Sequence, residues 1–150
     1  MSGGVVNLPD LYMDIKYSMR LFLQIDIGTW QQRSYYTPLV AYASSLASDL
    51  MGTDIDNESE ASVIDLVIKL AEQASSIFIF IAITSESALG GADKMMQYLI
   101  RHESNIHQIA MVGEHATIEK LCQNFPGRFL NVENQEDVKK LLRDFAEKIA

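Results

Sequence analysis

Several features that would place a protein in a special class are scarce or missing in this chain of 150 residues. Its one cysteine, Cys122, cannot form an internal disulfide, which excludes a disulfide-stapled secreted scaffold. The N-terminus lacks the basic and then apolar stretches of a secretory signal. The longest apolar run, residues 77–83, is far shorter than the roughly 20 residues that cross a bilayer. We therefore expect a cytoplasmic protein that does not span a membrane.

Positive charge is also in short supply. The chain has 12 Lys and Arg residues against 20 Asp and Glu residues, which gives a formal net charge of −8. Nucleic-acid binding needs a basic face that displaces counterions, and anionic membranes also attract basic surfaces. The composition therefore argues against nucleic-acid and membrane partners. Four of the acidic residues lie together in residues 54–60, so the rest of the surface is closer to neutral.

What is present is enough apolar sequence for one core. The hydrophobic fraction is 48%, which suits a single domain over residues 1–150. Residues 77–83 form a continuous β-branched and aromatic run typical of a strand buried on both faces. Shorter runs at 109–112 and 129–132 follow, and a helical pattern comes after each of the three runs. This alternation predicts a three-layer α/β fold with a mostly parallel sheet of four to five strands flanked by helices, in a flavodoxin-like or doubly wound outline.

The middle of the chain predicts two successive helices. Thr37-Pro38 is typical of a helix start, and the first helix is expected to end at Gly52. An acidic loop follows at residues 54–60. Within it, the pattern Asn57-x-x-Glu60 resembles a capping box that begins the second helix.

The N-terminal part predicts a strand from Met19 to Ile27, which ends at Gly28. Odd positions are apolar from residue 11 to residue 27, so we expect one buried face. Residues 8–17 also fit a helical stripe. We prefer a strand there, at a sheet edge and antiparallel to its neighbour.

Parallel sheets bind ligands beyond the carboxyl ends of their strands, so candidate chemistry is sought there. The segment after residues 77–83 is the richest, because it offers hydroxyls and glycines before a helix. It contains neither the phosphate-loop nor the dinucleotide-binding glycine pattern. A loop that caps the next helix explains this segment. The alternative is a site for a nucleotide or phosphorylated ligand, formed by Thr84, Ser85, Ser87, Gly90 and Gly91 with His115 and Arg33 nearby. The sequence indicates no cofactor for it.

Patterns for catalysis and metal binding are weak. Ser85 or Ser87 could meet His115 and Asp26 at adjacent strand ends, but no nucleophile-elbow pattern is present. The three histidines lack metal-ligand spacing. The acidic residues at 54–60 depart from a calcium-binding loop at two of its positions. We therefore assign no catalytic and no metal-binding residue, and we favour a non-enzymatic protein.

A short loop after the first strand combines aromatic and arginine side chains, which is the composition of interface anchors. The same composition also suits a loop that packs over the end of the sheet, so both interpretations stay open. As the candidate partner surface we name Trp30, Arg33, Tyr35 and Tyr36.

Two outlines resemble known signalling domains. From residue 77 onward, the order of strands, helices and the turn Glu86-Ser87-Ala88-Leu89-Gly90 is similar to anti-sigma-factor antagonist (STAS) domains. That resemblance implies phosphorylation of Ser87, although the aspartate of the family's turn is missing. The order of elements before and including residues 77–83 looks like a Toll/interleukin-receptor (TIR) domain. The NAD-cleaving members carry a glutamate in the next helix, and residues 88–100 contain none.

These observations leave three functional hypotheses. The first is a cytoplasmic, non-enzymatic α/β interaction or regulatory module that self-associates or binds another protein. The second is a small-molecule sensor or enzyme that uses the turn at residues 84–91. The third is a STAS-like or TIR-like signalling domain.

Overall fold

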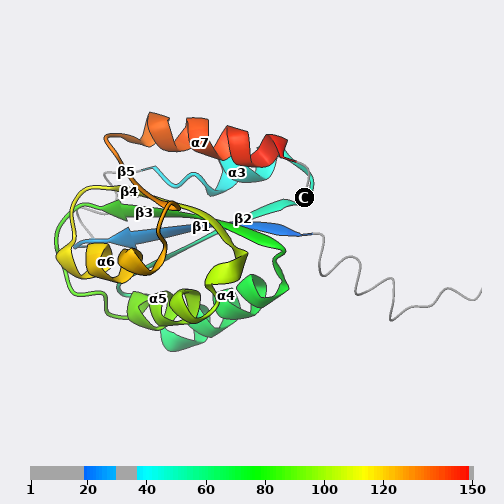
Figure 1. The fold of residues 1–150 in the computed structure, drawn as a ribbon. Coiled ribbons are helices and arrows are strands. Elements are labelled where there is room, and N and C mark those ends of the chain that lie inside the picture. The colour runs from blue at the N-terminus through cyan, green and yellow to red at the C-terminus, as the bar shows by residue number, and fades with distance from the viewer. Residues whose placement is uncertain (1–18, 30–36, 149–150) are drawn as a thin grey trace, which may run out of the picture.

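The computed structural model describes residues 19–29 and 37–148 (Figure 1). Strands and helices alternate along the chain, as the pattern of its C-terminal half predicts. Two single turns of 3-10 helix precede β4 and β5. In chain order the strands and α-helices are β1 (Arg20–Ile27), α3 (Val40–Leu46), β2 (Leu50–Asp56), α4 (Ala61–Gln73), β3 (Ser76–Ile83), α5 (Ala92–Arg101), β4 (Ile106–Val112), α6 (Ala116–Leu121), β5 (Phe129–Val132) and α7 (Gln135–Glu147).

The five described strands form one sheet in the order β2-β1-β3-β4-β5, and every neighbouring pair is parallel. This confirms the three-layer, flavodoxin-like α/β fold. The described sheet contains no antiparallel strand. Residues 8–17, where we expected one, lie outside the described residues.

Helices cover both faces of the sheet (Figure 1). Helices α4, α5 and α6 pack on one face, over Ile77, Ile79 and Ile81 of β3. Helices α3 and α7 pack on the other face, over Phe78 and Phe80. Strand β3 is buried on both sides because it is central and covered twice, which is why its sequence is a continuous apolar run.

The middle of the chain differs from its prediction. The first helix ends at Leu46, and Leu50–Asp56 form strand β2. This strand replaces both the predicted end of the helix at Gly52 and the first part of the predicted acidic loop at residues 54–60. Strand β2 lies at an edge of the sheet, and only its Leu50 and Ile55 are buried, so it carries no long apolar run. The apolar spacing of residues 39, 43, 46 and 50 fits a helix equally well. The apolar spacing therefore predicted a helix where the chain forms an edge strand.

Two further predictions change in detail. Strand β1 is buried on both faces rather than one, because β2 and β3 flank it and helices cover it. Helix α4 begins after Glu60 without a side-chain cap, so the predicted capping box is not formed. By contrast, Asn134 does cap α7, since its Oδ1 accepts a hydrogen bond from the Asp137 N–H at 3.0 Å. No described helix is both long and apolar enough to cross a membrane.

Candidate functional site

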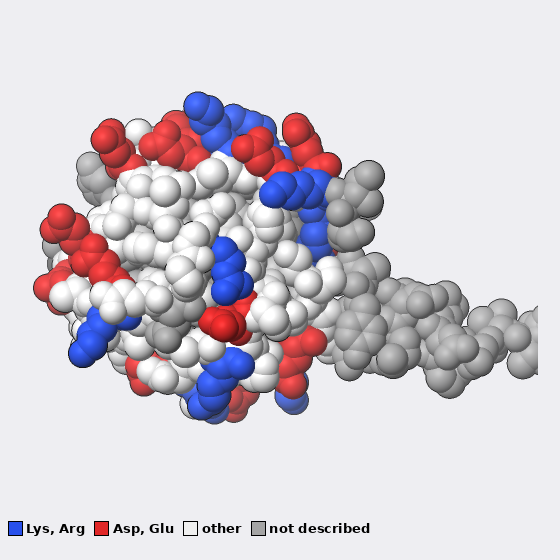
Figure 2. All heavy atoms as spheres, viewed as in Figure 1, with Lys and Arg blue, Asp and Glu red and all other residues white. Residues whose placement is uncertain are grey.

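The strand order reverses between β1 and β3, which lie side by side although β2 and α4 separate them in sequence. In open parallel sheets, ligands bind at the carboxyl ends of the strands at such a reversal. Here the two segments that leave this point begin at Gly28 and Thr84. Figure 2 shows one group of Asp and Glu side chains at the left, where the strands in Figure 1 end, and others along the top and the bottom of the view.

The hydroxyls predicted to bind a ligand are engaged within the protein. Thr84 continues the pairing of β3 with β1, because its N–H and its hydroxyl both donate to the Ile27 carbonyl, at 2.9 and 3.2 Å. Ser85 and Ser87 share a hydrogen bond between their hydroxyls at 2.8 Å. The structure thus places these three residues together, half-buried, in one turn.

Gly90 and Gly91 allow two loops to touch. A Cβ atom at Gly90 would lie 2.1 Å from the carbonyl oxygen of Asn57, and one at Gly91 would lie 2.1 Å from that of Ser59. The Gly91 N–H donates to the Asn57 carbonyl at 3.0 Å. Backbone carbonyls therefore occupy the space that we had expected a phosphate to use, and their partial charge is negative.

Asn57 connects three segments of this edge, a role that the sequence did not reveal. Its N–H donates to the Asp26 carbonyl at 3.2 Å, and its side-chain Oδ1 accepts from the Gly28 N–H at 3.2 Å. Its own carbonyl accepts from Gly91. The ends of β1 and β2 and the start of α5 are thereby joined at one residue.

Hydrogen bonds of His115 and Glu86 connect the turn at residues 84–87 to the start of α6. His115 is 4% exposed, and its Nδ1 accepts a hydrogen bond from the Ile118 N–H at 3.4 Å. The proton must then lie on Nε2, which donates to the Ser87 carbonyl at 2.6 Å. Glu86 accepts a hydrogen bond from the Ala116 N–H at 2.6 Å, so its carboxylate lies where the helix dipole favours an anion.

Gln24 and Asp26 complete the described part of the site. Gln24 is fully buried; its Oε1 accepts from the Leu39 N–H at 2.8 Å, and its Nε2 donates to Asp26 at 3.0 Å. A polar residue inside a strand was the only sequence signal for it. The remaining predicted residues, Trp30, Arg33, Tyr35 and Tyr36, lie outside the described residues, and their roles stay predictions.

A hollow of about 450 Å³ lies beyond β4 and β5. Gly113, Glu114, Glu119, Asn131, Val132 and Glu133 line it. Its three carboxylates repel phosphate, so this hollow does not extend the predicted site for a phosphorylated ligand. Among the described residues, no group of three or more His, Cys, Asp or Glu side chains is arranged to hold a metal ion.

Cys122 is not an activated nucleophile. Burial raises the pKa of its thiol to about 12, and the nearby Glu119 carboxylate acts in the same direction. The thiolate, which is the reactive form, is therefore scarce near neutral pH.

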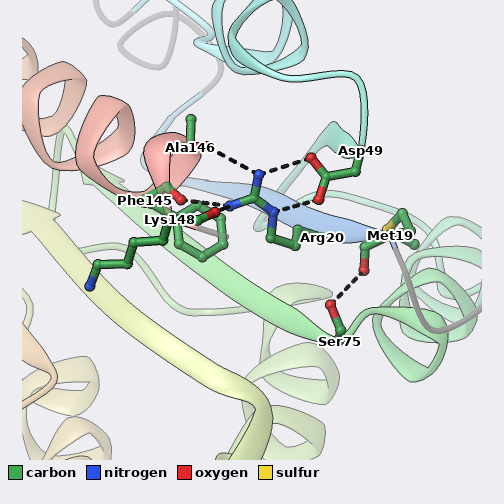
Figure 3. A network of polar contacts seen from close by, with 7 residues as sticks. All are labelled: Met19, Arg20, Asp49, Ser75, Phe145, Ala146 and Lys148. Atoms are coloured by element: carbon green, nitrogen blue, oxygen red, sulfur yellow. Dashed lines mark hydrogen bonds and ion pairs between the residues drawn. The ribbon is translucent and has the colours of Figure 1, made fainter. Parts of the chain in front are cut away.

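At the opposite, amino edge of the sheet, Arg20 forms the most extensive polar network of the described residues (Figure 3). It is 4% exposed and forms two hydrogen bonds to Asp49, at 2.7 and 2.8 Å. It also donates to the carbonyls of Phe145, Ala146 and Lys148 at 2.6, 3.2 and 3.1 Å. This cluster joins β1, the start of β2 and the end of α7, and these hydrogen bonds of the Arg20 guanidinium are all to the protein itself.

Comparison with models of known protein families finds no match. A search of curated proteins finds no similar sequence either.

Proposed function

We propose that this chain is a non-enzymatic interaction or regulatory module that acts through protein–protein contacts. The supporting observation is the hydrogen bonding of the polar groups beyond the carboxyl ends of the strands, which we call the carboxyl edge. The hydroxyls of Thr84, Ser85 and Ser87, the imidazole of His115 and the carboxylate of Glu86 all bond to the protein itself. A nucleophilic catalyst would pair a serine hydroxyl with the imidazole, whereas His115 bonds to the Ser87 carbonyl and the Ile118 N–H.

Large apolar side chains are exposed near both edges of the sheet. On β2 this is Met51, and on β5 it is Leu130; Val63 and Leu66 are exposed on α4, which packs on one face of the sheet. Leu66 is the most exposed, at 63%. Edge strands offer backbone hydrogen-bonding groups to other chains, and apolar side chains beside them favour association. The two edge strands are therefore candidate partner surfaces, in addition to the predicted loop that contains Trp30.

Thermal unfolding with a panel of nucleotides and sugar phosphates tests the proposal. A ligand that binds only the native state raises the melting temperature by mass action. We expect no saturable shift with any member of the panel. A saturable rise that the double variant Ser85→Ala/Ser87→Ala abolishes would overturn the proposal.

That result would favour the alternative, a small-molecule sensor or enzyme at residues 84–91. The strand order supports this alternative, because the segments of Gly28 and Thr84 leave the sheet at its reversal point. A matched control is Ser45→Ala, since Ser45 lies on α3 and bonds to the Tyr42 carbonyl. A true ligand shift must survive in this variant.

A further inference from the structure

We propose that the groove between β5 and α7 binds a second copy of this chain about a twofold axis. The groove has a volume of about 320 Å³ and is lined by Leu130, Val132, Asp137, Lys140, Leu141 and Asp144. This inference rests on the proposed function, because it names the surface and the partner of the interaction module.

The floor of the groove lies along β5, the last strand of the described sheet. Strand β5 pairs with β4 on one side, and the described chain places no strand on its other side. Leu130 and Val132 lie opposite Ala110 and Val112, so they project from the sheet face that α7 covers. Natural edge strands commonly carry a charge to prevent pairing, whereas Leu130 presents an apolar side chain that is 43% exposed.

The rim of the groove carries both signs of charge. Lys140 and Asp144 are exposed and lie four residues apart, on the same side of α7. Within the described residues, neither side chain forms an ion pair; the α7 ion pair is instead that of Lys139 with Glu136. Figure 2 shows acidic and basic side chains intermixed along the upper rim, where α7 lies in Figure 1.

The opposite charges of Lys140 and Asp144 allow the rim of one copy to pair with the same rim of a second copy. In a twofold interface the same patch is used on both copies, so each group must find its partner on the other copy. An axis midway between Lys140 and Asp144, with the two α7 helices antiparallel, places each Lys140 opposite the partner's Asp144. The two ion pairs then flank an apolar contact of Leu130 and Leu141. A partner with charge of only one sign would leave either Lys140 or the carboxylates of Asp137 and Asp144 without a partner.

Sedimentation equilibrium of the full chain over a range of concentrations tests the inference. We expect the wild type to form a concentration-dependent dimer. Leu130→Asp and Lys140→Asp should each raise the dimer dissociation constant about tenfold or more, because one buries a charge and the other places two like charges together. The reversal Lys140→Asp/Asp144→Lys should restore the dimer, since it recreates both pairs across the axis.

Leu66→Asp is the matched control, because it adds the same charge at an exposed apolar position on α4, which packs on the opposite face of the sheet from α7. It should leave the dimer unchanged. Circular dichroism of each variant verifies folding. A wild type that stays monomeric at all concentrations would overturn the inference, as would a dimer that only Leu66→Asp disrupts, or a charge reversal that fails to restore association. The proposed function itself fails only if a small molecule binds at the carboxyl edge.

Discussion

Replacing Arg20 by methionine is expected to lower the free energy of unfolding by about 3 kcal/mol, the lower end of the range for breaking a buried charged network. Methionine keeps most of the packing volume over the Phe145 ring, which the guanidinium faces at 5.2 Å. The substitution removes the guanidinium hydrogen bonds to Asp49 and to three carbonyls at the end of α7. Urea denaturation measures the loss, because it reports the unfolding free energy directly.

Asp49→Asn is the companion variant, and it should cost less than Arg20→Met. The Asp49 side chain is 32% exposed, so water replaces part of what it loses. Hydrogen bonding by Arg20 lowers the pKa of Asp49 below its usual 3.8. The stabilisation is therefore present above about pH 4 and is lost as pH falls through the lowered pKa. Equal losses in the two variants would show that the carbonyls of α7 contribute nothing.

Gly90→Ala is expected to lower the unfolding free energy by about 3 kcal/mol, from two causes. Gly90 has φ of +51°, which costs an L-residue roughly 1–2 kcal/mol. The added Cβ would also meet the Asn57 carbonyl oxygen at 2.1 Å, and forcing the loops apart costs about 1–3 kcal/mol more.

Gly127→Ala separates these two causes. Gly127 also has a positive φ, of +80°, but a Cβ atom there meets nothing within 4 Å. Only the backbone cost remains, so we expect a loss of roughly 1–2 kcal/mol by urea denaturation. If the two alanine variants lose the same amount, the close contact between residues 57–59 and 90–91 does not stabilise the fold.

The sequence predicted those elements whose local pattern matches their surroundings. Strand β3 is buried on both faces, so its apolar run is continuous. Helix α7 has one apolar face and a capping Asn134, so both its period and its start are visible in the sequence. Strand β2 was missed because an exposed edge strand needs few apolar residues. The apolar residue at its start, Leu50, continues the helical spacing of α3, so the sequence predicted a longer helix there.

The candidate site was harder to predict, because its contacts join distant segments. The structure places His115 against the turn of residues 84–91, because the carboxyl ends of neighbouring parallel strands lie on the same side of the sheet. Nothing local indicates that Asn57 bonds to Gly28 and Gly91, which lie about 30 residues away on either side. Buried Arg20 and Gln24 were unexpected for the same reason: their polar side chains resemble a solvent-facing strand face until their partners are known.

The most direct test of the proposed use of the carboxyl edge is the unfolding free energy of His115→Ala. If this edge holds the fold together, removing the imidazole leaves the Ser87 carbonyl and the Ile118 N–H without their partner. We expect a loss of about 2 kcal/mol by urea denaturation. A group kept for ligand binding is commonly held at the expense of stability, so its removal leaves stability unchanged or raises it. An unchanged or higher unfolding free energy for His115→Ala would therefore contradict a structural role for this edge and favour a binding site.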